Sequence, residues 1–180
     1  MNNKTLDYYN QNAKEFVAGT VAVDFNEIQN RFIEKLSGKN VLDFGCGSGR
    51  DTKYFLQAGL HVTAIDGSEE MCRCASEYTG IKVQHMLFQE LSEKNTYDGI
   101  WACASILHLS KEDLHQVILK TADALRTGAI SRYVYTALHG GSIMRKWTND
   151  GRMMIICCND STHPFIFKIE RIDILENEED

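Results

Sequence analysis

The stretch from Asn40 to Thr52, with the sequence NVLDFGCGSGRDT, decides the fold. A short apolar run ends at Phe44, glycines follow at positions 45, 47 and 49, and an amphipathic segment comes next. This order predicts a strand, a tight loop and a helix. Glycine permits positive φ and lets a ligand approach the backbone without meeting a Cβ atom. The free N–H groups of the helix would favour a negative group in the loop, although a turn that only starts a helix is the alternative.

The residues around the glycines separate the kinds of glycine-rich loop. A nicotinamide or flavin fingerprint places its third glycine three positions after the second, where this chain has Arg50, and no Gly-Lys-Ser/Thr follows to make a phosphate loop. Asp43 stands two residues before Gly45, and Asp66 stands 21 positions after it. This pattern resembles the cofactor loop of class I S-adenosylmethionine-dependent methyltransferases, in which an apolar strand, an acidic residue and one further residue precede Gly-x-Gly-x-Gly.

The resemblance implies that the cofactor is S-adenosyl-L-methionine, which has no phosphate and therefore needs no lysine in the loop. Asp43 would attract the ammonium group of the cofactor, directly or through water. The backbone of the loop at Gly45, Cys46, Gly47 and Gly49 would receive its carboxylate.

A second strand is expected over residues 60–65, and Asp66 follows it directly. An acidic residue at this place can accept hydrogen bonds from both ribose hydroxyls of a nucleotide-like ligand. Gly67 and Ser68 would line the adenosine through their backbones. Asp66 could instead cap the next helix, but Ser68 already fills that role before Glu69.

A third strand is expected over residues 82–88. Leu87 stands where the family usually has an aspartate that holds the adenine amino group. The adenine contact is therefore expected from the backbone of Phe88 and from apolar packing.

The segment after the fourth strand should approach the methyl group of the cofactor. Ala102 and Cys103 are small enough to let the cofactor lie against the strand end. His108 is a candidate general base, since the pKa of histidine lies near neutrality. Packing, or capping of the helix expected from Ser110 to Gly128, is the alternative role for His108.

The resemblance implies that the N-terminal part, residues 1–38, forms a helical lid over the cofactor. One amphipathic helix is predicted over residues 5–17, and Tyr8 or Tyr9 would reach the cofactor or simply pack. Asp24 and Glu27 predict a capping box for a second helix that ends at Ser37-Gly38.

We expect one domain, with a cofactor-binding core over residues 39–136. The part from 137 to 180 departs from the family and is divergent or shortened. It could close the sheet with an antiparallel pair, residues 153–158 against 165–172.

Composition narrows the classes of partner. The 180 residues carry a net charge of −6 and no cluster of Lys and Arg, so a nucleic acid partner is not expected. No apolar run has membrane-spanning length and no signal peptide begins the chain, so we expect no membrane partner and a cytoplasmic location. Six cysteines lie mostly in apolar segments and match no zinc spacing, so reduced thiols and no metal are expected.

Together these features predict a Rossmann-like α/β fold, a doubly wound and mostly parallel sheet with helices on both faces. The resemblance implies transfer of a methyl group from S-adenosylmethionine to a small-molecule acceptor. A binding protein without catalysis and a nicotinamide-dependent oxidoreductase are the alternatives. The sequence leaves the acceptor and the oligomeric state open.

Overall fold

The structure is a computed structural model that describes residues 3–106, 109–126, 134–135, 147–149 and 152–154. Its centre is a five-stranded sheet with the order β3-β2-β1-β4-β5, in which every neighbouring pair is parallel. The strands are β1 (Asn40–Phe44), β2 (His61–Asp66), β3 (Gln84–His85), β4 (Gly99–Trp101) and β5 (Val134–Tyr135). The predicted doubly wound, parallel fold is thus confirmed.

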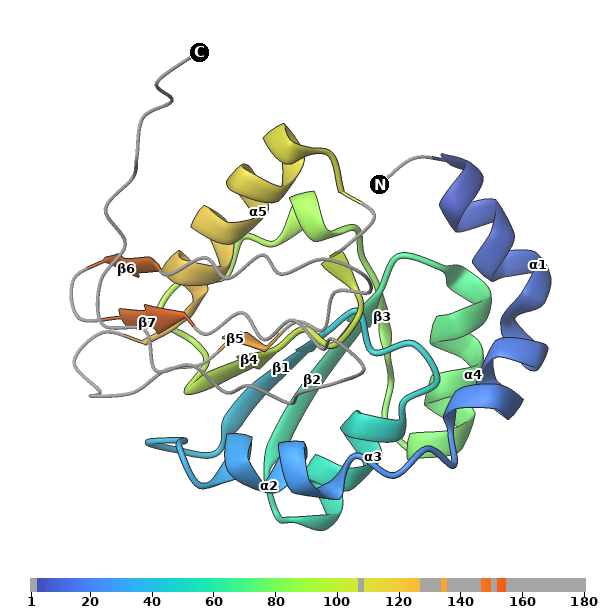
Figure 1. Cartoon of the computed structure of the whole chain (residues 1–180), viewed down its shortest axis with the longest axis horizontal. Coiled ribbons are helices and arrows are strands. Elements are labelled where there is room, and N and C mark those ends of the chain that lie inside the picture. Colours follow the sequence, from blue (N-terminus) through green and yellow to red (C-terminus); the bar gives the residue numbers. More distant parts are fainter. Residues whose placement is uncertain (1–2, 107–108, 127–133, 136–146, 150–151, 155–180) are drawn as a thin grey trace, which may run out of the picture.

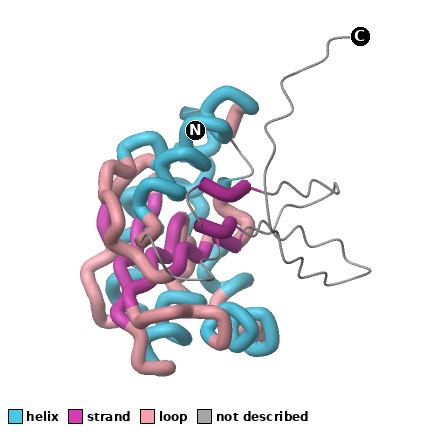
Figure 2. Tube along the Cα trace, turned by 90° about the vertical axis from the view of Figure 1, so that its left-hand side faces the viewer, coloured by secondary structure: helices cyan, strands magenta, loops and turns pink. Residues whose placement is uncertain are grey.

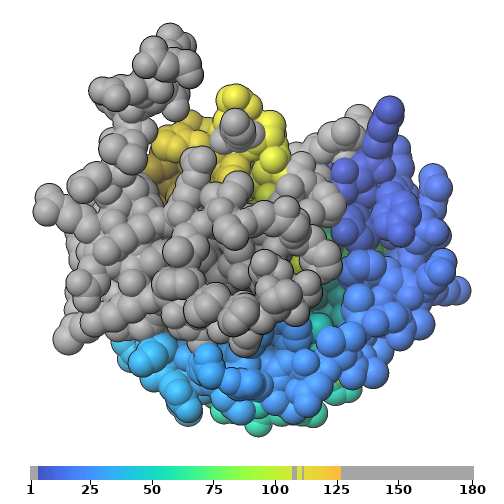
Figure 3. Space-filling view, in the orientation of Figure 1, coloured from blue at the N-terminus to red at the C-terminus, as the bar shows by residue number. Residues whose placement is uncertain are grey.

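Helices cover both faces of this sheet (Figures 1 and 2). The helices are α1 (Asn3–Thr20), α2 (Asn26–Ile33), α3 (Arg50–Gln57), α4 (Glu69–Thr79) and α5 (Lys111–Ala124), with a 3₁₀ turn η1 (Phe88–Glu90). Figure 1 shows α5 on one side of the sheet and α2 and α3 on the other. In the same orientation, the N-terminal residues form the right and lower side of the visible face (Figure 3).

Alternation along β1 builds the two halves of the core. Leu42 is fully buried in a cluster with Ile100 and Val117, which lies under α5 and η1. Its neighbour Val41 is fully buried in a second cluster, which includes Phe55 of α3. Successive side chains of a strand point to opposite faces, so a strand covered on both faces is mostly apolar, and the buried Asp43 is the exception in β1.

The central strand β1 also sets the position of the site. It lies between β2 and β4, so the chain leaves β1 in one direction and later returns to its other side. Ligands of open α/β sheets bind outside the carboxyl ends of the strands at such a switch point. The glycine loop leaves β1 at this place.

Several element boundaries differ from the expected ones. The predicted third strand over 82–88 is reduced to Gln84–His85, and Phe88 begins η1 instead. The predicted capping box of α2 is wrong: Asp24 Oδ1 accepts from the N–H of Asn26 at 2.9 Å, and the cap residue Phe25 makes no side-chain bond.

The predicted ends of α2 and α5 were also wrong. After Ile33 the N–H groups of Lys35 and Leu36 bond three residues back, so α2 changes into a tighter turn before Ser37. α5 ends at Ala124, because Leu125 is extended and pairs with Tyr97 beside the sheet.

An antiparallel pair is present near the C-terminal end, but with other residues than expected. β6 (Trp147–Asn149) pairs with β7 (Arg152–Met154), so Met153 faces Thr148. The expected pairing of 153–158 with 165–172 is not tested, because residues 155–180 lie outside the described part. Within the described residues, no helix is long and apolar enough to cross a membrane.

Candidate functional site

The glycine loop has a conformation that requires glycine. Gly45, Gly47 and Gly49 have φ of 85°, 55° and 78°, in the left-handed region that side chains disfavour. The N–H groups of Gly45 and Cys46 both donate to the carbonyl of Ile65, at 3.0 and 2.9 Å. These two bonds fix the loop to the end of β2, so that the turns after β1 and β2 adjoin.

The turn after β4 closes tightly onto the same loop. A Cβ atom at Gly45 would lie 2.4 Å from the Cβ of Ser105 and 3.0 Å from Cζ of Phe88. Ser105 Oγ donates to the carbonyl of Phe44 at 2.6 Å. Its neighbour Ala104 has a φ of 53°, which is strained for a residue with a side chain. The sequence analysis did not single out Ser105. Strained turns are common at functional sites, but the strain at Ala104 is visible only in the structure.

Asp66 lies at the carboxyl end of β2, where a carboxylate that binds the ribose was predicted. Its Oδ2 accepts from the N–H of Gly47 at 3.0 Å, and its Oδ1 accepts from the N–H of Ser68 at 2.9 Å. Burial raises the pKa of Asp66, and the backbone N–H groups around it oppose this rise. The structure therefore brings Asp66, Gly47 and Ser68 together, with the carboxylate aimed at the loop.

Apolar side chains border the neighbouring turn. A Cβ atom at Gly67 would lie 3.1 Å from Cδ2 of Leu6 and 3.4 Å from Cδ2 of Leu87. Leu87, which replaces the usual aspartate, thus offers an apolar wall beside the turn. Ser68 is the N-cap of α4, as predicted, since its Oγ accepts from the N–H of Met71 at 3.2 Å.

Helix α1 lies across both turns. Phe16 Cε1 would be 3.5 Å from a Cβ atom at Gly47, and the rings of Phe16 and Tyr9 meet edge to face at 5.3 Å. Burial and then the nearby charge of Asp66 raise the pKa of Tyr9. Tyr8 is 58% exposed, so of the two predicted lid tyrosines only Tyr9 faces the site.

Asp43 lies beneath the loop and is 1% exposed. Thr52 Oγ1 donates to Asp43 Oδ2 at 2.5 Å, which joins the end of β1 to the first turn of α3. Burial, followed by the charge of Asp51, raises the pKa of Asp43 to about 8. In this structure Asp43 supports the loop from below, and its predicted contact with an ammonium group stays a prediction.

A buried ion pair lies next to Asp43. Asp51 is 6% exposed, and its two oxygens accept from Arg50 at 2.8 and 3.0 Å, from Gln29 Nε2 at 2.6 Å and from Trp101 Nε1 at 2.8 Å. The guanidinium of Arg50 also lies 4.3 Å above the ring of Phe25. Sequence reasoning used Arg50 only as the residue that replaces a glycine. A buried Trp N–H needs an acceptor, and this was the signal available for Asp51.

Four residues that were predicted to contact the cofactor have largely buried side chains. Phe88 and Ala102 belong to the core cluster under α5, so a ligand would meet their backbones rather than their side chains. Burial raises the pKa of Cys46, and it raises the pKa of Cys103 to about 12. Both thiols therefore stay protonated near neutral pH and are not nucleophiles.

The candidate general base His108 lies outside the described residues. Among the residues that are described, no group of three or more His, Cys, Asp or Glu side chains could hold a metal ion. What the described site offers is a carboxylate acceptor and apolar walls on adjoining turns, whereas the N–H groups of Gly45, Cys46, Gly47 and Gly49 already donate to Ile65, Asp66 and Cys46 within the protein. That combination suits a nucleoside.

Comparison with known proteins shows which family the chain resembles. A family model described as a methyltransferase domain matches residues 41–128. An uncharacterized methyltransferase from Bacillus cytotoxicus is 33% identical over 110 residues, which are 60% of this chain and 51% of that protein. Another from Staphylococcus carnosus is 25% identical over 136 residues, which are 76% of this chain and 55% of that protein. The chain spans about half the length of these relatives.

The fold is also similar to that of solved methyltransferase structures. A crystal structure of 1,6-didemethyltoxoflavin-N1-methyltransferase from Burkholderia thailandensis has a TM-score of 0.55 to this chain at 23% identity. The match covers 68% of this chain and 56% of that one. That enzyme was crystallised with bound 1,6-didemethyltoxoflavin and S-adenosylhomocysteine.

Proposed function

Because the chain belongs to the class I S-adenosylmethionine-dependent methyltransferases, we propose that it binds S-adenosylmethionine at the glycine loop and transfers the methyl group to a small-molecule acceptor. The observation that carries this proposal is the placement of Asp66. Its carboxylate adjoins the loop N–H of Gly47 at the carboxyl edge of the sheet, 3.0 Å away. A ribose with two neighbouring hydroxyls would donate to such an oxygen pair.

The residues fit the cofactor by their chemistry. Asp66 would accept from the ribose, Gly67 and Ser68 would border the adenosine, and the glycine loop would lie against the methionine end. Apolar walls from Leu6 and Leu87 would flank the adenine in place of the usual aspartate.

The bound cofactor supplies a methyl group on a sulfonium, which is already an activated leaving group. The residues of the chain then need to orient the acceptor and keep water out, and both effects lower the barrier. A general base is needed only where the acceptor must lose a proton. His108 remains the proposed base for that case.

Two observations support a small-molecule acceptor and a reducing compartment. The structural neighbour from Burkholderia thailandensis, a methyltransferase, has 1,6-didemethyltoxoflavin and S-adenosylhomocysteine bound. The four cysteines of the described residues, at positions 46, 72, 74 and 103, are free thiols, which fits the cytoplasm.

Thermal unfolding with added ligands tests the proposal. S-adenosylhomocysteine should raise the melting temperature, because a ligand that binds only the folded state stabilises it, and NAD should not. Release of S-adenosylhomocysteine during incubation with S-adenosylmethionine and a set of candidate metabolites would then identify the acceptor. Stabilisation by NAD alone would favour an oxidoreductase. Binding with no release across alcohols, amines, thiols and activated carbons would favour a binding protein without catalysis.

A further inference from the structure

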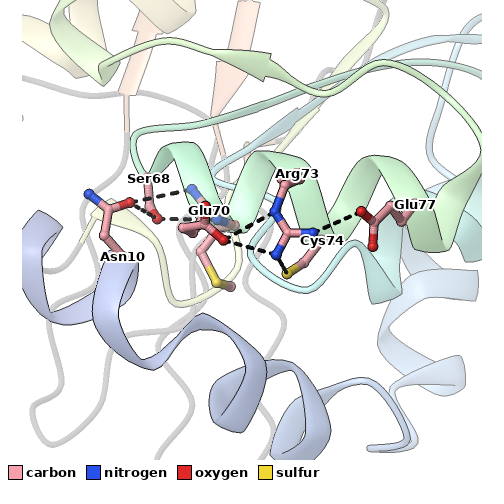
Figure 4. Close-up of polar contacts among 7 residues, drawn as sticks. Asn10, Ser68, Glu70, Arg73, Cys74 and Glu77 are labelled. Atoms are coloured by element: carbon pink, nitrogen blue, oxygen red, sulfur yellow. Dashed lines mark hydrogen bonds and ion pairs between the residues drawn. The ribbon is translucent and has the colours of Figure 1, made fainter.

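Asn10 of α1 joins this helix to the turn that follows β2 (Figure 4). Its Oδ1 accepts from Ser68 Oγ at 2.7 Å and, more weakly, from the N–H of Glu70 at 3.4 Å. Both donors belong to the N-terminal end of α4, where backbone N–H groups lack partners within the helix. Asn10 thus caps α4 from a residue 58 positions away in the sequence.

The same contact continues to the proposed cofactor site. The hydroxyl of Ser68 donates to Asn10 Oδ1 at 2.7 Å, and the backbone N–H of Ser68 donates to Asp66 Oδ1 at 2.9 Å. The other oxygen of Asp66 holds the N–H of Gly47 at 3.0 Å. A continuous chain of hydrogen bonds therefore runs from α1 through the turn after β2 to the glycine loop.

The contact also decides which residues of α1 face the turns. Leu6, Tyr9, Ala13 and Phe16 share one face with Asn10, at the three- and four-residue spacing of a helix. Leu6 contacts the region of Gly67, Phe16 contacts that of Gly47, and Ala13 is 3% exposed. With α1 held in this register, Tyr9 comes close enough to Asp66 for the carboxylate charge to affect the tyrosine pKa.

We propose that Asn10 is a positioning residue for the cofactor, which holds α1 closed over the nucleoside end of the site by capping α4. This inference rests on the proposed function. Asn10 acts through Ser68 and Asp66 and through the placement of Tyr9, and it need not touch the ligand. Its loss should loosen the lid and shorten the time for which the ligand stays bound.

The alternative is that Asn10 only stabilises the fold. In that case Asn10→Ala would lower the melting temperature of the ligand-free protein and leave the ligand affinity unchanged. A positioning role instead predicts weaker binding and faster dissociation of the ligand, whether or not the melting temperature of the ligand-free protein changes.

The test compares variants of the full chain by calorimetric titration with S-adenosylhomocysteine and by stopped-flow measurement of its dissociation. Asn10→Ala should weaken binding about three- to tenfold, the range that one hydrogen bond contributes, mainly through faster dissociation. Asn10→Asp keeps the acceptor oxygen and should bind within about twofold of the wild type. Asn12→Ala is the matched control, because among the described residues the side chain of Asn12 bonds to the Tyr8 carbonyl of its own helix, at 2.8 Å, and to no residue of another element.

A double-mutant cycle assigns the effect to the contact itself. In the Ser68→Ala background the main donor to Asn10 is absent, so Asn10→Ala should change the affinity less than twofold. Unchanged affinity and dissociation in Asn10→Ala, with a wild type that binds, would overturn this inference and leave the proposed function standing. A wild type that does not bind S-adenosylhomocysteine would overturn the proposed function instead.

Discussion

At the scale of single residues, Gly45 shows what the loop demands of the sequence. It has a positive φ of 85°, and the turn after β4 approaches it so closely that a Cβ atom would lie 2.4 Å from Ser105. Two independent features therefore require glycine at this place: the backbone conformation and the close approach of the Ser105 side chain.

Gly45→Ala should lower the free energy of unfolding by about 2–4 kcal/mol, through backbone strain and overpacking together. Gly59→Ala is the matched control: Gly59 has a φ of 80°, but no atom lies within 4 Å of its added Cβ. Strain alone should then cost about 1–2 kcal/mol. Urea denaturation measures both values, and equal losses in the two variants would remove the close approach from the account.

Sequence reasoning found the residues whose partners are near in the chain and missed those whose partners are far. Asp66 and Ser68 follow a strand directly, so the end of β2 and the N-cap of α4 could be inferred from position. Asn10 and Asp51 depend on contacts with Ser68 and Trp101, 58 and 50 residues away, which no local pattern encodes. Such contacts exist only once the helices have packed.

At the scale of elements, the ion pair of Arg50 and Asp51 fixes the start of α3. Gln29 joins it from α2, and Trp101 joins it from β4. Three elements that border the glycine loop are thereby joined at one buried carboxylate. Burial lowers the pKa of Arg50, but the hydrogen bonds and the charge of Asp51 raise this pKa above its usual value.

Asp51→Ala should cost about 2–4 kcal/mol of stability, because it leaves three sets of donors without their acceptor and one charge without its partner. Glu27→Ala removes an ion pair with Arg31 whose side chains are 44% and 73% exposed, so it should cost less than about 0.5 kcal/mol. Thermal and urea denaturation compare the two variants. A loss as small in Asp51→Ala as in Glu27→Ala would mean that the buried pair does not hold these elements together.

The sequence predicted the strands that lead to the site and the cap of α4, because their signals are local. It did not predict where α2 begins or where α5 ends. The carboxylate of Asp24 accepts from the N–H of Asn26, the first residue of α2, and the N–H of Arg126 donates to the carbonyl of Tyr97 at 2.9 Å. A local contact thus replaces the capping box at the start of α2, and a tertiary contact ends α5 before the expected stop at Gly128.

At the scale of the whole molecule, stability should depend on pH through Asp43. Its pKa in the folded protein is raised to about 8 by burial and by Asp51, so the folded state binds this proton more tightly than the unfolded state. The contribution of Asp43 to the free energy of unfolding is therefore complete below its unfolded pKa of about 4, and it is lost as the pH rises toward 8.

Asp43→Asn gives the measurement. The amide oxygen can still accept from Thr52, but it cannot ionise. The stability of the wild type relative to Asp43→Asn should decrease between about pH 4 and pH 8, as measured by urea denaturation. Arg50, Asp51 and Asp66, which face Asp43, are present in both proteins, so the difference reports the ionisation of Asp43 together with its interaction with these charges. A constant difference over this range would show that Asp43 keeps one charge state throughout.

The central claim is that Asp66 binds the cofactor, and calorimetric titration with S-adenosylhomocysteine tests it most directly. The wild type should bind one equivalent, and Asp66→Ala should bind with about 1–3 kcal/mol less free energy, because charge-assisted hydrogen bonds to the ribose are lost. Circular dichroism would establish that the variant is folded. Equal affinity in a folded Asp66→Ala variant would contradict the account and place the ligand elsewhere.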